Sequence, residues 1–159
     1  MRWSVLDSPI GELSVAVDDD GLCRVRFGAI ELGPERAQDP LLTAAEEQLT
    51  AYFAGELKEF DLPLSVRVGS KFERAVWDQL MRIPYGEMQT YGDVAKAVGD
   101  AGAARAVGTA CNRNPIPVIV PCHRVVGAGG KMVGFGGGIP LKRHLLELEA
   151  RITLETSWL

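Results

Sequence analysis

A proline-rich segment followed by a glycine-rich one constrains this chain more than any other feature. Pro115, Pro117 and Pro121 lie close together just before Cys122. They exclude a helix there, because each proline lacks a backbone donor and fixes φ, and they predict an extended, rigid approach to Cys122. Residues 127–138 then contain seven glycines in twelve. Such a loop lets backbone amides approach a ligand closely, so a functional site is expected around the cysteine.

The residues before position 70 predict a small α/β unit. Residues 13–17 and 22–27 alternate apolar and polar side chains between turns, which is typical of a β-hairpin or meander. Residues 41–54 repeat apolar side chains at helical spacing, so one helix is expected to pack on this sheet. Residues 62–68 contain a proline and would suit an edge strand. Gly69 marks the expected boundary, which divides the chain into domains 1–69 and 70–159.

The sequence of the second domain predicts a series of short helices. Ser70 and Glu73 have the spacing of a capping box that opens a helix ending before Pro84. Helices are also expected over 90–99 and 101–112, and a last helix begins at Pro140 with leucines on one face. The pair joined by Gly99-Asp100 has the proportions of a helix-turn-helix. The residues alone leave open a plain αα-hairpin inside a helical core.

Charge is distributed unevenly between the two domains. Residues 1–69 carry six basic and thirteen acidic side chains, whereas residues 70–159 carry eleven and eight. From Thr90 to Leu145 there are seven basic residues and only two acidic ones. A polyanionic partner is therefore expected to meet the second domain.

The three cysteines have different surroundings in the sequence. Cys23 and Cys111 fit the common role of a free cysteine as a small buried apolar residue. Cys122 stands next to His123 and Arg124, between the proline-stiffened segment and the glycine-rich loop. Neighbouring positive charge lowers a thiol pKa and activates the sulfur. Cys122 is therefore the candidate nucleophile.

A histidine next to a cysteine needs further groups before it acts as a base. Adjacent side chains of an extended segment point to opposite faces, so we expect His123 to reach Cys122 through a water molecule. The imidazole then needs an acceptor to orient it, and Glu147 or Glu149 of the last helix offers one, with Glu149 at the rim of the buried face. Asn114 is placed to fix the backbone around the cysteine.

Several segments together resemble the active-site signature of the O6-alkylguanine-DNA alkyltransferases, also called methylated-DNA-protein-cysteine methyltransferases. The similarity is strong over about residues 70–151 and weak at Ser8-Pro9-Ile10-Gly11. The segments that carry it are Pro121-Cys122-His123-Arg124-Val125, Asn114-Pro115-Ile116-Pro117, the glycine loop, Leu145-Leu146-Glu147-Leu148-Glu149, Ile83-Pro84-Tyr85-Gly86-Glu87, Thr90-Tyr91-Gly92 and Arg105-Ala106-Val107-Gly108. The resemblance implies a ribonuclease-H-like α/β domain followed by a helical domain that contains the helix-turn-helix.

The resemblance also implies a reaction and roles for five residues. An alkyl group would pass irreversibly from O6 of guanine in DNA to Cys122, once per protein molecule; activity on O4-alkylthymine stays open. His123 would act as the base through water, and Glu149 would orient His123. Tyr91 would protonate the departing guanine, and Asn114 would brace the site.

The resemblance further implies binding to double-stranded DNA through the minor groove. The alkylated base must leave the stack to be reached, and Arg105 would fill the gap it leaves. The helix of residues 103–112 would lie in the groove, where Ala104, Ala106 and Gly108 permit a close approach. Tyr91 is expected to contact the DNA as well.

A substrate pocket is implied around the glycine-rich loop. At the position where the family usually has tyrosine this chain has Phe135, so base stacking is kept and a hydroxyl is lost. The next residue is Gly136, where the family commonly has a small side chain, so its amide is left to recognise O6. The residues implied in the pocket are Cys111, Met132, Val133, Gly134, Phe135 and Gly136.

Composition and spacing predict a folded cytoplasmic monomer without cofactors. Hydrophobic residues make up 47% and charged residues 24% of the chain, far from the composition of disordered proteins. No apolar run approaches the ~18 residues of a membrane-spanning helix, and Asp7 interrupts any signal-peptide core. The three cysteines are widely spaced, so we expect no disulfide and no metal site. The alkyl group comes from the lesion, so no methyl-donor cofactor is implied.

Two other functions deserve comparison. An alkyltransferase-like protein binds lesions without chemistry, but such proteins replace the cysteine that stands here at position 122. A Cys-His hydrolase would need an oxyanion hole, which the sequence does not suggest, and would leave Tyr91 and Arg105 without a role.

Overall fold

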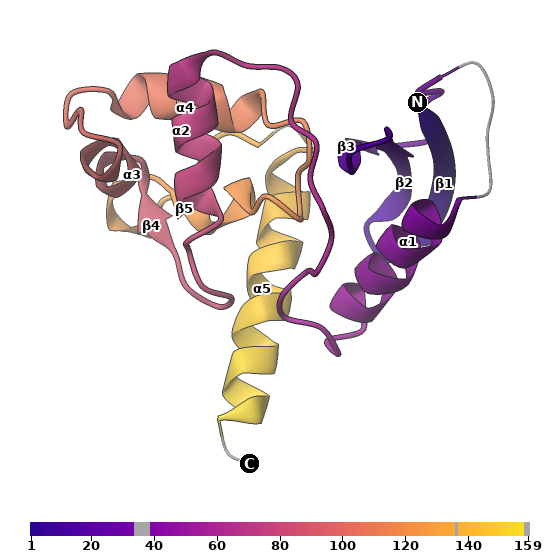
Figure 1. Ribbon diagram of the computed structural model, residues 1–159. Helices are drawn as coiled ribbons and strands as arrows, with labels where there is room; N and C mark the ends of the chain where they lie inside the picture. Colours follow the sequence, from indigo (N-terminus) through magenta and orange to yellow (C-terminus); the bar gives the residue numbers. More distant parts are fainter. Residues whose placement is uncertain (34–38, 136, 158–159) are drawn as a thin grey trace. The chain divides into compact units, whose positions relative to one another are not determined.

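The computed structural model describes residues 1–33, 39–135 and 137–157. They form two compact units, Met1–Val68 and Gly69–Leu159, each with its own core. No helix in these ranges is both long enough and apolar enough to cross a membrane. The chain thus consists of a sheet unit followed by a helical unit (Figure 1).

The first unit is built on a three-stranded antiparallel sheet in the order β1-β2-β3. Its strands are β1 (Arg2–Ser8), β2 (Gly11–Val17) and β3 (Leu22–Phe27). The β2–β3 hairpin confirms the alternating pattern seen in the sequence. Strand β1 was not predicted; it pairs with β2 along its whole length, from Arg2 opposite Val17 to Ser8 opposite Gly11.

Helix α1 (Pro40–Phe53) lies along this sheet and closes the first core (Figure 1). The Asp39 side chain caps the helix by accepting hydrogen bonds from two backbone amides of the first turn. The expected edge strand over 62–68 is reduced to a single parallel bridge between Leu22 and Leu64. Pro63 lacks a backbone donor and contributes only its carbonyl, which accepts from Leu22 at 2.8 Å.

The second unit is mainly helical, and capping boxes start its first two helices, the box at Ser70 and Glu73 as predicted. Ser70 and Glu73 cap α2, and Thr90 and Asp93 cap α3. The elements of this unit are α2 (Lys71–Leu80), β4 (Gln89–Thr90), α3 (Tyr91–Ala97), α4 (Ala104–Asn112), the 3-10 turn η1 (Cys122–Arg124), β5 (Val125–Val126), the 3-10 turn η2 (Ala128–Gly130) and α5 (Ile139–Thr156).

Two long-range contacts position the elements that carry Cys122. Trp77 of α2 is buried, and its Nε1 donates to the Ala110 carbonyl of α4 at 2.8 Å. Strands β4 and β5 pair in parallel, with Gln89 opposite Val125. Since Tyr91 directly follows β4, and β5 directly follows η1, this pairing brings the start of α3 next to the turn that contains the cysteine.

The proline-rich segment contains no helix, as predicted, but it is not extended. Residues 114–126 are all buried and fold into tight turns, with the Val120 amide donating to the Ile116 carbonyl at 2.9 Å. Val118 has a φ of 74°, the left-handed region that a β-branched residue rarely adopts. The prolines exclude a helix but permit turns, and compact turns allow this apolar segment to enter the core.

Gly69 allows a close packing contact that can be tested. Its φ is +95°, and a Cβ at this position would lie 2.5 Å from the ring of buried Trp77. We expect Gly69→Ala to lower the free energy of unfolding of the second unit by about 2–4 kcal/mol, from backbone strain plus the steric clash. Gly99 is the matched control, because its φ is +90° but nothing lies within 4 Å of its Cβ position.

Gly99→Ala should therefore show the backbone cost alone, about 1–2 kcal/mol in denaturant unfolding followed by Trp fluorescence. Equal losses in the two variants would contradict the proposed contact with Trp77.

Candidate active site

The turn η1 places three chemically active side chains in the core in succession. Cys122, His123 and Arg124 are 5%, 0% and 7% exposed, which is unusual for a polar stretch. In a 3-10 turn, consecutive side chains project about 120° apart rather than to opposite faces. The expectation of an extended Cys122–His123 pair was therefore wrong: Cys122 and His123 belong to one 3-10 turn.

His123 and Arg124 both bind the same carboxylate, that of Glu149 on α5. His123 Nε2 lies 2.7 Å from Glu149 Oε2. Arg124 donates from Nε to Oε1 at 2.8 Å and from Nη2 to Oε2 at 3.0 Å, a two-pronged contact. The Gly86 amide adds a fourth donor, 3.2 Å from Oε1. Glu149 is completely buried and accepts hydrogen bonds from Arg124 and from the Gly86 amide, so it is held as an anion.

These contacts set the protonation states of the pair. Burial alone would raise the pKa of Glu149, but the hydrogen bonds from His123 and Arg124, together with the charge of Arg124, outweigh it and hold that pKa well below its usual range. Burial lowers the pKa of His123, more than the Glu149 contact raises it, and the Arg124 charge lowers it further. His123 is therefore neutral at neutral pH. Its Nδ1 is buried and has no hydrogen-bond partner among the described residues.

Cys122 is a protonated thiol at rest, contrary to the expectation of a lowered pKa. Burial raises the pKa of Cys122, and a hydrogen bond with Asn114 and the charge of Lys142 offset only part of that effect. Asn114 also fixes the turn before the cysteine, since its side chain donates to the Val120 carbonyl at 2.8 Å and accepts from the Ile116 amide at 2.9 Å. The thiol therefore needs a base before it can act as a nucleophile.

Lys142 contributes a buried ammonium group to the site. Its side chain is 0% exposed, and Nζ donates to the carbonyls of Val125 at 2.5 Å and Val133 at 3.2 Å. It also lies over the Tyr91 ring, 5.7 Å from the centroid. Lys142 thus links α5, β5, the glycine-rich loop and the start of α3 around one positive charge.

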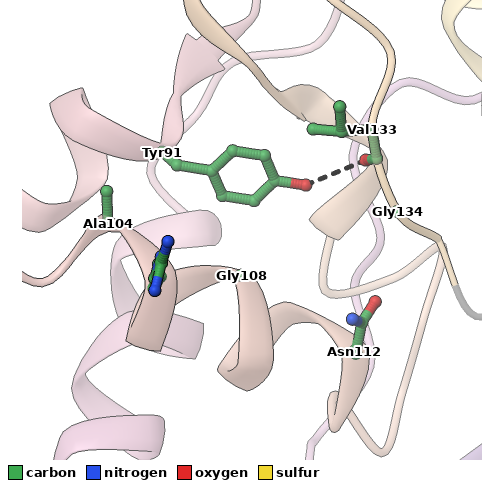
Figure 2. A pocket seen from close by; sticks show the side chains of 7 residues that line it. Tyr91, Ala104, Gly108, Asn112, Val133 and Gly134 are labelled. Atoms are coloured by element: carbon green, nitrogen blue, oxygen red, sulfur yellow. Dashed lines mark hydrogen bonds between the residues drawn. The ribbon is translucent and has the colours of Figure 1, made fainter.

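A cavity of about 340 Å³ opens beside Tyr91. Ala104, Gly108 and Asn112, four residues apart along α4, form one side of it, and Val133 and Gly134 of the glycine-rich loop form the other (Figure 2). The lining residues are Tyr91, Ala104, Arg105, Gly108, Asn112, Val133 and Gly134.

Tyr91 connects this cavity with the thiols. Its side chain lies between the two walls, and its hydroxyl donates to the Val133 carbonyl at 3.1 Å (Figure 2). Burial raises the pKa of Tyr91 to about 12, with smaller contributions from Cys111 and Cys122 nearby. The phenol therefore keeps its proton at neutral pH.

Both units match the models of one protein family. Residues 1–66 match "6-O-methylguanine DNA methyltransferase, ribonuclease-like domain", and residues 71–151 match "6-O-methylguanine DNA methyltransferase, DNA binding domain". The methylated-DNA-protein-cysteine methyltransferase of Mycobacterium tuberculosis is 50% identical over 153 residues, covering 94% of this chain and 92% of the relative. The chain belongs to the 6-O-methylguanine DNA methyltransferase family.

Further methyltransferases agree with this assignment. The protein of the same name from Methanosarcina acetivorans is 47% identical over 154 residues, covering 94% of this chain and 98% of the relative. The crystal structure of M. tuberculosis OGT in complex with DNA superimposes with a TM-score of 0.88 at 48% identity, covering 96% of this chain and 94% of that one. A methyltransferase structure from Pyrococcus kodakaraensis gives 0.71 at 26% identity, covering 93% and 98%.

Within this family fold, the structure decides between the two glutamates offered for His123. Glu149 binds the imidazole, whereas Glu147 is exposed on the same helix. Glu149 was expected at the rim of the buried face but lies fully inside it. It can do so because Arg124, at its side, compensates the charge.

The six residues expected in the substrate pocket do not all line the same cavity. Val133 and Gly134 line the cavity beside Tyr91. Met132 does not; it lines a second cavity of about 220 Å³ together with Gly86, Met88, Leu146, Glu147, Glu149 and Ala150. Neither the buried Cys111 of α4 nor the half-buried Phe135 lines the first cavity. Gly136 lies outside the described residues.

The residues expected at the DNA also occupy different positions on α4. Ala104, Arg105 and Gly108 line the cavity, whereas Ala106 is exposed outside it. In the described ranges no group of three or more His, Cys, Asp or Glu residues could hold a metal ion.

Sequence reasoning missed Lys142 and Asn112 as parts of the site, and it named Arg124 only as a positive neighbour of Cys122, not as a partner of Glu149. For Lys142 a signal was available: it precedes Leu145 by three positions and Glu149 by seven, a helical spacing that indicates the buried face. Asn112 follows Ala104 by eight positions, two turns along the same face of α4. For Arg124 the signal was weaker, because a 3-10 turn cannot be distinguished in advance from an extended segment.

The buried Glu149 anion makes stability depend on pH. Because the folded pKa of Glu149 is depressed, its contribution is complete above the unfolded value of about 4.3 and is lost as pH falls toward the folded one. Glu149→Gln should lower the free energy of unfolding by about 3–5 kcal/mol at pH 7, because it leaves Arg124 buried without its anion.

The difference in the free energy of unfolding between Glu149→Gln and the unmodified protein should be smaller at pH 3.5 than at pH 7, as measured by urea unfolding. Glu147→Gln, on the exposed side of the same helix, should change stability by less than about 0.5 kcal/mol at either pH. A constant gap from pH 7 to 3.5 would rule out the proposed ionisation of Glu149.

Proposed function

We propose that this protein repairs DNA by moving the alkyl group of O6-alkylguanine irreversibly onto Cys122. One observation supports this most: a buried thiol adjoins in sequence a neutral histidine whose Nδ1 has no partner among the residues that the structure describes, and the thiol acts on the pKa of Tyr91, which lines the cavity next to α4. The family membership of the whole chain agrees with that chemistry.

The protonation states assign a role to each group. Nε2 of His123 carries a proton toward Glu149, so the lone pair of Nδ1 takes the thiol proton of Cys122 through one water molecule. The thiolate attacks the alkyl carbon, the S–C bond forms, and the C–O6 bond breaks with its electrons on guanine. Tyr91 then gives the guanine anion a proton and recovers one from solvent as His123 releases its own. Lys142 stabilises the thiolate by its charge.

On the DNA side, we assign α3 and α4 to a helix-turn-helix with α4 in the minor groove of double-stranded DNA. These two helices pack against each other, and the small residues Ala104 and Gly108 leave room for a flipped base next to Tyr91. Arg105 is exposed at the cavity, where it can enter the stack and replace the extruded guanine. Ala106, exposed beside it, allows the close approach to the sugar-phosphate backbone.

The two domains divide the work in this proposal. Residues 70–159 hold the thiol, its proton relay and the cavity. Residues 1–69 form a ribonuclease-H-like domain, in keeping with a sheet covered by one helix and with the ribonuclease-like family match. The protein acts as a monomer in this proposal, since one chain supplies every group that the reaction needs.

Stoichiometric self-alkylation at Cys122 tests the chemistry. After mixing with an oligonucleotide that carries O6-methylguanine, the intact protein mass should rise by one methyl group, and peptide mapping should locate it on Cys122. Cys122→Ser should stay unmodified, because an alcohol is scarcely ionised where a thiol can be. Methyl on Cys23 or Cys111, or repeated turnover by one molecule, would refute the assignment.

Arg105→Ala separates base flipping from chemistry. We expect repair of duplex DNA to slow by about 5- to 150-fold, equivalent to roughly 1–3 kcal/mol, because the flipped state is less populated. Reaction with free O6-benzylguanine, which needs no extrusion, should be nearly unchanged in single-turnover assays.

Arg113→Ala is the matched control for Arg105. It removes an exposed arginine just after α4 that pairs with Glu73 at 3.5 Å and does not line the cavity. Equal loss of duplex and free-base activity in Arg105→Ala would mean that the arginine has a structural role only.

A further inference from the structure

The proton relay to Cys122 depends on a residue that does not touch the thiol. Arg124 contacts Glu149 with two nitrogens, and Glu149 in turn contacts His123. We propose that Arg124 is a positioning residue: its charge keeps His123 neutral at rest, and its two-pronged grip on Glu149 fixes the tautomer with a free Nδ1. This inference rests on the proposed function, because it concerns the base of that same reaction.

Geometry supports the first part, the fixed tautomer. The two oxygens of Glu149 accept from Arg124 Nε and Nη2 and from the Gly86 amide at 2.8, 3.0 and 3.2 Å. Arg124 is itself anchored, since Nη1 donates to the Ile83 carbonyl at 2.7 Å. The carboxylate therefore cannot rotate away from His123, and Oε2 can only accept. His123 must donate from Nε2, which leaves the Nδ1 lone pair for the thiol proton.

Charge balance supports the second part, the neutral resting state. Glu149 with Arg124 makes a neutral pair, so a proton on His123 would leave the buried cluster with a net positive charge. Without Arg124, the Glu149 anion would be neutralised by a proton, and His123 is the nearest group to take it. Uncompensated buried charge costs several kcal/mol, so the cluster adopts the neutral combination in either case.

The charged groups around His123 divide by sign: the two cations oppose its protonation, and the Glu149 anion favours it. Glu149 and Lys142 face it from α5, and Arg124 faces it from its own turn. Lys142 adds a second positive charge that disfavours an imidazolium. Helix α2, which also packs on this turn, buries only apolar side chains there: Val76, Trp77 and Leu80. Among the described residues that set the pKa of His123, Glu149 is the anion that favours protonation, and Arg124 holds it on both oxygens.

Two substitutions separate charge from geometry. Arg124→Met removes the charge and the grip, whereas Arg124→Lys keeps a charge and loses the two-pronged contact. Arg151→Met is the matched control, since it removes an exposed arginine of the same helix as Glu149 that pairs only with Glu155 at 3.6 Å. Unfolding curves would show that each variant is folded before it is assayed.

Two readouts are needed. Imidazole ¹⁵N spectra recorded against pH report the protonation and tautomer of His123 directly, without any reaction. Single-turnover rates with free O6-benzylguanine, measured by protein mass from pH 5.5 to 9.5, report the base in action.

For the unmodified protein we expect a neutral His123 with the proton on Nε2 at pH 7. In Arg124→Met the imidazole should be protonated at pH 7, and the acid limb of the rate profile should move up by about one pH unit or more. The rate should fall at every pH, as in Arg124→Lys, because the two-pronged contact is lost, and by at least about a further tenfold at pH 6, because His123 is then protonated. Arg124→Lys should lose rate at every pH, with its acid limb unmoved, and Arg151→Met should match the unmodified protein.

The results that overturn the inference are equally distinct. A protonated His123 in the unmodified protein at pH 7 would refute it even if Arg124→Met failed to fold. So would a folded Arg124→Met with a uniform loss of rate and an unchanged His123 titration. An Arg124→Lys variant with normal tautomer and rate would refute the role of the two-pronged contact. Failure of the proposed function would look different: the unmodified protein would not alkylate Cys122, while the ¹⁵N titration would still test Arg124.

Discussion

Burial of the Glu149 carboxylate is the interaction on which the second unit depends. An isolated carboxylate in a core is prohibitively costly, so the fold must supply donors from several directions. They come from η1, through His123 and Arg124, and from the segment before β4, through Gly86. Helix α5, the cysteine turn and the chain ahead of α3 are thereby held together. The same contacts determine which nitrogen of His123 is free to accept a proton.

The secondary structure of this chain could be predicted where a local signal decides it. The capping boxes at Ser70 and Thr90 mark the starts of α2 and α3, and the alternating strands β2 and β3 follow their side-chain pattern. Cys122 and His123 could be singled out because a rare short motif contains them. In each case the information lies within a few residues, so no tertiary contact is needed to read it.

The remaining features depend on contacts between distant residues. The pKa of Cys122 was expected to fall because positive residues stand beside it, but it rises because burial outweighs them. The spacing of Lys142 indicates the buried face of α5, but the two backbone carbonyls that receive its ammonium group come from Val125 and Val133, outside that helix. Strand β1 exists because β2 provides a complete partner along its length. Burial and pairing are properties of the folded chain, so the sequence indicates them only where the spacing of apolar residues reveals which face of an element is buried.

The protonated, enclosed state of Cys122 has a consequence for the lifetime of the protein. Peroxides and disulfides react with the thiolate rather than the thiol, and they need access to the sulfur. Cys122 is a residue only 5% exposed, and burial raises its pKa, so it resists oxidation by peroxides and disulfides. A molecule that uses its cysteine only once cannot replace a damaged one. A sulfur that stays a thiol until an alkylated guanine reaches the site preserves each copy for the long interval before it meets a lesion.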